Sequence, residues 1–319
     1  MSRARSGKAL TPIASFLRAC NRTPLRGRTR LTLLLARWLK QLQAVPIEID
    51  GTTVFMDLRM LPSHFWLIGT PFGTSPYEVA EQEIMRTLVM PGDIAFDIGA
   101  NLGLHTVLLA HLVGAHGRVF AFEPNPEMLS NLALTLLAFP NTTLCPYALS
   151  DENREATLFV PADHSMASLS DWTSDDNLAG FRSRLGLGAP HRFTVPQRML
   201  DEMVNDDTLP APDFIKCDAE GAELMIFRGG RGVLDQSGAP TILFEAGPDT
   251  ARGFGVTVTD AAAFLAALPG PGYQFFEVNQ ECALARLRPS DFQERNQNVL
   301  AVPAERMSHV AARCTIRGA

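Results

Sequence analysis

The sequence predicts an α/β fold in which a mostly parallel sheet is covered by helices on both faces. From Asp93 onward, short apolar segments typical of strands alternate with longer segments that have helical spacing. A glycine-containing turn, FDIGANLGLHT (96–106), joins the first of these strands to the first helix. Acidic residues directly follow several other strands. Such alternation is typical of parallel sheets, because each crossover places a helix on one face.

The strands and helices of this alternation are predicted from their apolar periodicity. Helices are predicted at Leu102–Val113, Pro126–Ala138, Ala222–Val233 and Thr259–Leu268. The last two predicted strands are joined by a stretch without a helical pattern, which indicates an antiparallel, hairpin-like edge. The predicted strands are Asp93–Asp97, Arg118–Phe122, Thr143–Ala148, Asp213–Cys217, Thr241–Glu245, Tyr273–Val278 and Asn298–Val302.

An insert interrupts the alternation after the third strand. Ala156–Val160 and Arg192–Gln197 are predicted to form an extra strand pair. The residues between them, about 161–192, are polar and rich in glycine. A long irregular insert in a compact domain is often functional, so we expect a mobile lid or substrate loop, with plain disorder as the alternative.

The residues before Asp93 contain further elements. Residues 29–44 have helical apolar spacing with a basic opposite face, and Val45–Leu58 is predicted to form one or two strands around the turn Asp50-Gly51. Ser75 is a candidate helix N-cap, Pro76 suits the first helical position and Glu78 completes a capping box, so a helix is predicted from there to about Val89. We therefore divide the chain into a basic arm (1–45), a cap segment (46–90), the main domain (91–305) and a C-terminal tail (306–319).

The basic arm differs in charge from the rest of the chain. Residues 1–45 carry ten basic residues and no acidic ones, whereas the remainder holds 18 basic and 34 acidic residues. Such an arm suits contact with a membrane surface, nucleic acid or an acidic partner, and it also fits a partly disordered extension or a cleaved targeting segment. No stretch of 18 consecutive apolar residues is present, so no transmembrane helix is expected. The five cysteines show no C-x-x-C spacing, which predicts reduced thiols and a cytoplasmic location.

The glycine turn after the first strand is a candidate cofactor site. Gly99 and Gly103 have G-x-x-x-G spacing, whereas a dinucleotide fingerprint requires G-x-G-x-x-G. Asn101 tolerates the left-handed backbone conformation, and the helix N-terminus that follows offers free N–H groups. The carboxylate of Asp97 would repel a pyrophosphate at this position, because both are anions. It suits instead the ammonium of an amino-acid moiety next to a sulfonium. Glu123, after the second strand, is placed to accept ribose hydroxyls, as it also is in proteins that bind NAD.

A second candidate site is PDFIKCDAEGAELMIFRGG (212–230), which begins with a buried-type strand. Because ligands bind at the carboxyl ends of parallel strands, Asp97, Glu123, Asp218 and Glu245 are expected to surround one crevice. Asp218 and Glu220 are candidate general bases, since neighbouring carboxylates raise one pKa toward neutrality. The alternative is structural, with Glu220 capping the next helix and Asp218 fixing a turn. Asp218, Glu220 and Glu245 also suit a hard cation, although we expect no metal.

Taken together, these segments resemble the FkbM family of S-adenosylmethionine-dependent methyltransferases. The resemblance covers about Tyr77–Pro303 and depends on YEVAEQEI, DIGANLG, VFAFEPNP, YALSDENREATLFV, SMASLS, DFIKCDAEGAELMIFRGG, ILFE and QNVLAVP. It implies a Rossmann-like class I methyltransferase fold with a seven-stranded sheet. It also implies methyl transfer to a hydroxyl oxygen of a sugar, a polyketide or another secondary metabolite. Cys217 and Ala219 depart mildly from the family pattern, where an aliphatic residue is usual.

The resemblance also implies roles for individual residues. The methionine end of S-adenosylmethionine is assigned to Asp97, Gly99, Ala100, Asn101 and Gly103. The ribose is assigned to Glu123 and Pro124, the adenine to Leu149, Ser150 and Asp151, and closure of the cofactor pocket to Tyr77 and Glu78. Ser168 and Glu245 are assigned to the acceptor side.

Three functions stay open on the sequence alone. An O-methyltransferase with a carboxylate base is the leading hypothesis, and its acceptor is a small molecule or glycan that carries a hydroxyl. A methyltransferase-like module that binds without catalysis is the second, and an NAD-dependent oxidoreductase is the third. A nucleic-acid acceptor is disfavoured, because the main domain lacks a basic stripe with interleaved aromatic residues.

Overall fold

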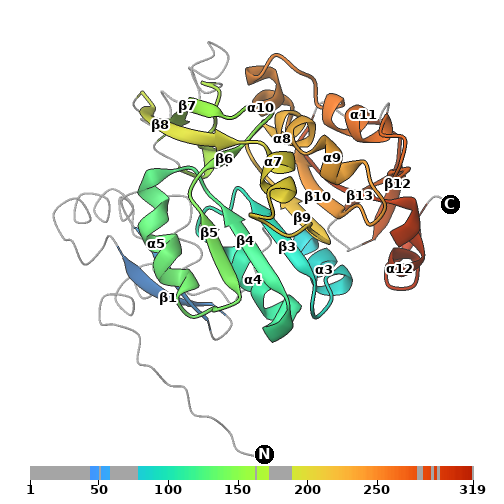
Figure 1. Ribbon diagram of the computed structural model, residues 1–319, viewed down its shortest axis with the longest axis horizontal. Coiled ribbons are helices and arrows are strands. Elements are labelled where there is room, and N and C mark those ends of the chain that lie inside the picture. Colours follow the sequence, from blue (N-terminus) through green and yellow to red (C-terminus); the bar gives the residue numbers. More distant parts are fainter. Residues whose placement is uncertain are drawn as a thin grey trace, which may run out of the picture.

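A computed structural model describes residues 44–49, 52–57, 78–161, 164–171, 189–278, 283–288, 291–292 and 295–317. Its main feature is a nine-stranded sheet in the order β14-β12-β11-β13-β10-β9-β3-β4-β5 (Figure 1). These strands are β3 (Ile94–Ile98), β4 (Arg118–Phe122), β5 (Thr142–Cys145), β9 (Phe214–Cys217), β10 (Thr241–Ala246), β11 (Gln274–Val278), β12 (Leu284–Leu287), β13 (Gln297–Val302) and β14 (Ile316–Arg317).

The predicted sheet topology is confirmed. Strands β5, β4, β3, β9 and β10 pair in parallel, and β13 lies antiparallel between β10 and β11. Six of the seven predicted strands are present in this sheet with small changes of their bounds, and the seventh, predicted at 143–148, is present as the shorter β5. Two short strands that the sequence did not predict, β12 and β14, extend the antiparallel edge. This arrangement is the Rossmann-like fold of class I methyltransferases.

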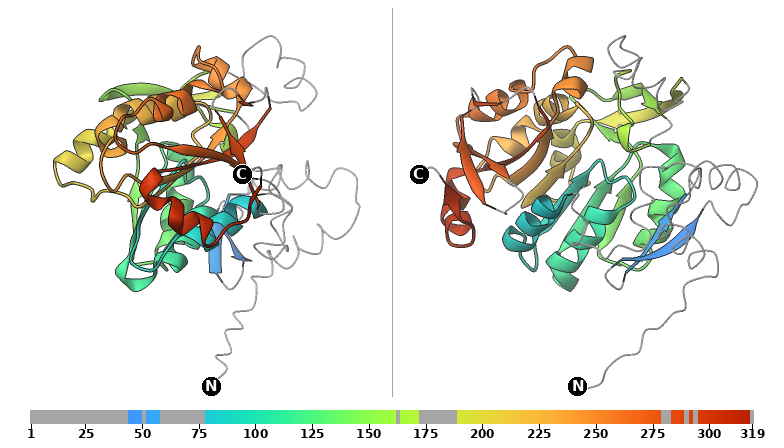
Figure 2. Two further views of the ribbon diagram at one scale, coloured as in Figure 1. Left: turned by 90° about the vertical axis from the view of Figure 1, so that its right-hand side faces the viewer. Right: turned by 180° about the vertical axis from the view of Figure 1, so that it is seen from behind.

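Helices cover both faces of the sheet (Figures 1 and 2). On one face, α3 (Val79–Leu88), α4 (Leu104–Val113), α5 (Pro126–Leu136) and α12 (Met307–Ala311) pack against strand residues such as Ala95 and Leu243. On the other, α7 (Leu200–Asn205), α8 (Glu223–Gly229), α9 (Arg231–Leu234) and α11 (Asp260–Ala266) pack against residues such as Phe96 and Phe244. Because successive strand residues point to opposite faces, each central strand contributes to both cores.

A smaller sheet lies after the third strand of the main sheet. It has the order β6-β8-β7, with β6 (Ala148–Leu149), β7 (Arg154–Val160) and β8 (His191–Arg198). The predicted extra strand pair is confirmed, since β7 and β8 are antiparallel partners. The single strand predicted at 143–148 is wrong, because β5 ends at Cys145 and β6 joins the smaller sheet. Pro146 lies between them and has no N–H to donate to a ladder.

Two helix predictions need correction. The predicted helix 222–233 is divided into α8 and α9, since α8 ends at Gly229 and Gly230 lies between the two helices. A Cβ on Gly229 would lie 1.9 Å from the carbonyl oxygen of Ser150, so this close approach requires glycine. The helix predicted from Leu102 begins instead at Leu104, after Gly103 in the left-handed conformation. The glycine turn is therefore longer than the sequence indicated.

The segment before the main domain forms a hairpin and a helix. Strands β1 (Val45–Ile49) and β2 (Thr52–Met56) pair antiparallel, and the N–H of Phe55 donates to Thr135 Oγ1 of α5 at 3.0 Å (Figure 1). Helix α3 begins at Val79, because Glu78 has φ 60° and lies outside the helix. The capping role predicted for Glu78 is thus wrong, while Ser75, Pro76 and residues 29–43 lie outside the described residues. Short helices α10 (Pro248–Gly253), η3 (Gly114–His116), η4 (His164–Met166) and η7 (Ala304–Arg306) complete the described elements.

No helix in the described part of the chain combines the length and apolar character needed to cross a membrane. Residues 1–43 of the basic arm lie outside the described residues, so the predicted contacts of the arm stay predictions.

Candidate active site

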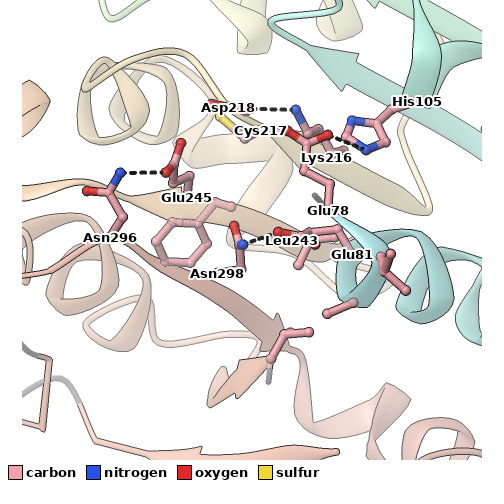
Figure 3. A pocket seen from close by; sticks show the side chains of 14 residues that line it. Glu78, Glu81, His105, Lys216, Cys217, Asp218, Leu243, Glu245, Asn296 and Asn298 are labelled. Atoms are coloured by element: carbon pink, nitrogen blue, oxygen red, sulfur yellow. Dashed lines mark hydrogen bonds and ion pairs between the residues drawn. The ribbon is translucent and has the colours of Figure 1, made fainter. Parts of the chain in front are cut away.

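A polar cavity of about 560 Å³ opens at the carboxyl ends of β9 and β10 (Figure 3). Helix α3, the first turn of α4 and the start of β13 form the rest of its wall. It is lined by Glu78, Val79, Ala80, Glu81, His105, Lys216, Cys217, Asp218, Leu243, Phe244, Glu245, Val278, Asn296 and Asn298. Its position agrees with the general placement of ligands at the carboxyl ends of strands in open parallel sheets.

The glycine turn packs directly against the loop that follows β9. Gly99 and Gly103 have φ of 81° and 83°, and Asn101 has φ 51°, which confirms the left-handed conformation predicted for it. A Cβ on Gly99 would lie 1.8 Å from the carbonyl oxygen of Asp218. The two sequence motifs are therefore in contact, and only glycine permits this spacing.

Asp97 is a completely buried carboxylate beneath the turn. Its Oδ2 accepts a hydrogen bond from Thr106 Oγ1 at 2.5 Å, whereas its Oδ1 is buried without a partner among the described residues. Burial raises the pKa of Asp97, although Lys216 and Thr106 oppose this. A buried acceptor without a donor is costly. Binding of the ammonium of an amino-acid moiety at this oxygen stays a prediction.

Glu123 lies on the other side of the turn and is also buried. Its Oε2 accepts from the N–H of Asn101 and its Oε1 from the N–H of Asn125, each at 2.8 Å. Burial raises the pKa of Glu123 to about 7, against the effect of these two hydrogen bonds. Each oxygen keeps a second lone pair for a hydroxyl donor, so binding of a ribose stays a prediction that this geometry allows.

Lys216 and Asp218 form an ion pair in the cavity wall, in which the lysine is buried and the carboxylate is partly exposed. The distance from Lys216 Nζ to Asp218 Oδ2 is 2.9 Å, and the lysine side chain is 7% exposed. Burial opposes the charge of Lys216, but Asp218, Asp97 and Glu78 outweigh it and raise its pKa. Burial likewise opposes the charge of Asp218, but Lys216 outweighs it and lowers the pKa of that carboxyl. Both groups are therefore ionised near neutral pH.

Glu220 and Glu245 lie beside Asp218, and carboxylate oxygens of the three residues lie within 4.8 Å of one another. Burial and the neighbouring Asp218 raise the pKa of Glu245 to about 9. Burial, Asp218 and Glu245 likewise raise the pKa of Glu220 far above its usual range. Asp218 is thus the ionised member of the three. The spacing is compatible with a divalent cation, and the absence of a metal stays a prediction.

Glu78, directly before α3, and His105 of α4 lie side by side in the cavity wall. The distance between Glu78 Oε2 and His105 Nε2 is 3.2 Å, and both side chains point toward Lys216 (Figure 3). Burial raises the pKa of Glu78 to about 7. Burial and Lys216 lower the pKa of His105 to about 3, so its imidazole is neutral.

The remaining predicted site residues that the structure describes do not line the cavity and lie on other elements of the fold. Leu149 and Ser150 are buried at the end of β6, and Ser150 Oγ lies 3.3 Å from Asp151 Oδ1. Ser168 is buried and donates through Oγ to the carbonyl oxygen of Glu220 at 2.8 Å. Pro124 separates Glu123 from the N-cap of α5. Tyr77 lies outside the described residues.

The structure brings Glu78, Asp218 and Glu245 together in the cavity wall, with Asp97 and Glu220 close behind it. Five polar lining residues were not predicted from the sequence, which are Glu81, His105, Lys216, Asn296 and Asn298. A lysine inside the apolar strand FIKC was the available signal, because an unpaired charge is rarely buried. The two asparagines carried no signal, since their relation to Glu245 and Glu81 depends on the pairing of β13 with β10.

The fold and this site define a class I methyltransferase domain, whose cofactor is S-adenosylmethionine. The family described as "Methyltransferase FkbM domain" matches residues 97–281, and the chain belongs to this family. The FkbM resemblance predicted from the sequence is thereby confirmed.

Individual relatives and structures are also similar to the chain. Hexuronic acid methyltransferase AglP of Haloferax volcanii is 25% identical over 178 residues, which cover 53% of this chain and 64% of that protein. The chain thus spans less than two thirds of this curated relative. The structure of precorrin-6y C5,15-methyltransferase from Geobacter metallireducens has 17% identity and a TM-score of 0.40, covering 71% of this chain and 88% of that one. Aeropyrum pernix fibrillarin in complex with S-adenosylmethionine has 11% identity and a TM-score of 0.37, with coverages of 70% and 73%.

Proposed function

We propose that this chain transfers a methyl group from S-adenosylmethionine to a hydroxyl oxygen of a sugar or another polar secondary metabolite. The observation that carries the proposal is the contact between the cofactor turn and an ionised carboxylate in a polar cavity. Gly99 touches the backbone of Asp218, whose side chain lines the cavity. The family membership supports methyl transfer, and the relative named as a hexuronic acid methyltransferase supports a sugar acceptor.

In this proposal the residues around the glycine turn hold the cofactor. The free Oδ1 of Asp97 binds the ammonium of the methionine end, and the N–H groups at the start of α4 face its carboxylate. Glu123 and Pro124 lie at the ribose, and Leu149, Ser150 and Asp151 at the adenine. Tyr77 and Glu78 close the pocket from the segment that precedes α3. When bound, S-adenosylmethionine supplies a methyl group on a positively charged sulfur, which becomes a neutral thioether on transfer.

Asp218 is the better of the two predicted bases. A general base must be ionised before it accepts a proton, and it must reach the reacting group. Lys216 keeps Asp218 ionised, whereas burial and neighbouring carboxylates keep Glu220 protonated. Asp218 also lines the cavity, which Glu220 does not. We therefore assign proton removal to Asp218, and we assign Glu220 to positioning Ser168 through its backbone carbonyl.

The test is a transfer assay with S-[methyl-³H]adenosylmethionine and a panel of glycosides and hydroxylated metabolites. We expect label in at least one hydroxyl acceptor with the wild-type chain. Asp218→Asn is expected to lose transfer by about 10²-fold or more while keeping cofactor affinity in calorimetry. Asp206→Asn is the control, because Asp206 is an exposed residue at the end of α7.

Two results contradict the proposal in different ways. Cofactor binding without transfer to any hydroxyl supports the alternative of a binding module without catalysis. Full activity of Asp218→Asn removes the assigned base but leaves the methyltransferase function intact.

A further inference from the structure

Lys216 has more hydrogen-bond donors than the described structure satisfies. Its ammonium carries three N–H donors, and its side chain is 7% exposed. Among the described residues, Asp218 is the one group within hydrogen-bond or ion-pair distance. Buried donors are almost always paired, so a group that enters the cavity is expected to supply an acceptor. Lys216 lines that cavity directly, as Figure 3 shows.

The charge around Lys216 indicates which acceptor fits. Asp218, in contact with the ammonium, and the nearby Asp97 and Glu78 together stabilise its charge and raise the pKa of Lys216. A further anion, such as the carboxylate of the cofactor, is repelled by these groups, because like charges at short range in a buried site interact strongly. A neutral hydroxyl oxygen accepts the hydrogen bond without adding negative charge.

We propose that the Lys216 ammonium donates a hydrogen bond to the acceptor hydroxyl and positions it against the Asp218 carboxylate. This inference rests on the proposed function and adds to it the residue that binds the reacting oxygen. During transfer the oxygen forms a bond to the methyl carbon and loses its proton to Asp218. The bond between carbon and sulfur breaks, and its electron pair stays on sulfur. Lys216 binds the oxygen throughout and keeps Asp218 ready to receive the proton.

The experiment compares Lys216→Met and Lys216→Arg with the wild type, and Arg228→Met on the exposed side of α8 is the control. Calorimetry measures S-adenosylmethionine affinity. Saturation-transfer NMR, with S-adenosylhomocysteine present, measures binding of methyl glucopyranoside, methyl galactopyranoside and methyl mannopyranoside. Circular dichroism checks that each variant folds.

We expect Lys216→Met to keep cofactor affinity within about threefold and to lose the glycoside signal. Lys216→Arg is expected to retain part of the signal, because it keeps the charge but changes the donor geometry. With an acceptor that the transfer assay identifies, kcat/KM is expected to fall by about 10²-fold or more in Lys216→Met. In the pH profile of kcat/KM, the acidic limb of this variant is expected to move to higher pH, because Asp218 loses the cation that lowers its pKa. A purely structural role lowers the rate without moving that limb.

Two outcomes overturn the inference. A loss of cofactor affinity of about tenfold or more in Lys216→Met shows that the ammonium binds the cofactor carboxylate instead. An unchanged glycoside signal in that variant shows that Lys216 does not bind an acceptor hydroxyl. Where the wild type gives no glycoside signal, the same comparison is made with the acceptor that the transfer assay identifies, and unchanged binding of that acceptor overturns the inference. Failure of the wild-type chain to bind S-adenosylmethionine is a separate result, and it contradicts the proposed function itself.

Discussion

Replacing Gly99 by alanine tests whether the cofactor turn and the catalytic loop depend on each other. Alanine at φ 81° costs about 1–2 kcal/mol, because its Cβ approaches the following carbonyl. The same Cβ lies 1.8 Å from the carbonyl oxygen of Asp218, so the two loops must separate. Overpacking of this kind typically costs a further ~1–3 kcal/mol. The expected total is about 2–5 kcal/mol in the free energy of unfolding.

Gly238 provides a matched control for this substitution. It has φ 79°, and a Cβ there would meet nothing within 4 Å. Gly238→Ala is thus expected to lower the free energy of unfolding only by the cost of the left-handed backbone conformation, about 1–2 kcal/mol. By thermal unfolding, we expect the melting temperature to fall by roughly 2–8 °C in Gly238→Ala and roughly 4–20 °C in Gly99→Ala.

Cofactor affinity gives the second readout. Gly99→Ala is expected to weaken S-adenosylmethionine binding by about tenfold or more, because moving the turn displaces the N–H groups that face the cofactor. Gly238→Ala is expected to leave the affinity unchanged. Equal melting temperatures and equal affinities in the two variants would show that the contact between the loops does not constrain the site.

Three further predictions concern single side chains around the turn. Asp97→Asn should weaken S-adenosylmethionine binding in calorimetry by about tenfold or more, and an unchanged affinity would contradict an ammonium at its free Oδ1. Burial raises the pKa of Glu123 from 4.5 to about 7, so the folded state binds this proton more tightly than the unfolded state does. The resulting stabilisation is fully present below pH 4.5 and is lost as the pH rises through about 7. The wild type should therefore lose about 3 kcal/mol between these pH values relative to Glu123→Gln in denaturant titrations, and parallel pH profiles would refute the shift. Ser168→Ala should lower the free energy of unfolding by about 1–3 kcal/mol, because it removes a buried hydrogen-bond donor to the carbonyl oxygen of Glu220. An effect no larger than that of Ser170→Ala, at a more exposed hydrogen bond, would show that the Ser168 contact does not stabilise the fold.

The strands of the main sheet could be predicted because their apolar character is local. Phe214–Cys217 and Thr241–Ala246 are buried on both faces, and continuous apolar runs of this length are typical of central parallel strands. Strand β14 could not be predicted in the same way, because its two residues pair only with β12. The extra edge strands thus depend on tertiary contacts that no local pattern records.

The candidate site could be predicted only in part for a similar reason. Asp218 directly follows a predicted strand and Glu245 ends another, and parallel pairing of β9 with β10 places both at one edge. Asn296 reaches Glu245 only because β13 returns antiparallel beside β10. The order of the strands in space, which the local pattern does not determine, therefore decides which polar residues complete the site.

Lys216 shows how one buried charge can organise several carboxylates. Without it, Asp97, Asp218 and Glu78 would face one another in a buried site, and their mutual repulsion would favour protonation. With it, Asp218 is ionised while Glu78 titrates near neutrality and Glu245 stays protonated. Neighbouring carboxyl groups thus differ in their protonation at the same pH, so one can accept a proton while another donates a hydrogen bond. This separation requires the lysine at its place in β9, two residues before Asp218, where alternation along the strand turns both side chains to the same face.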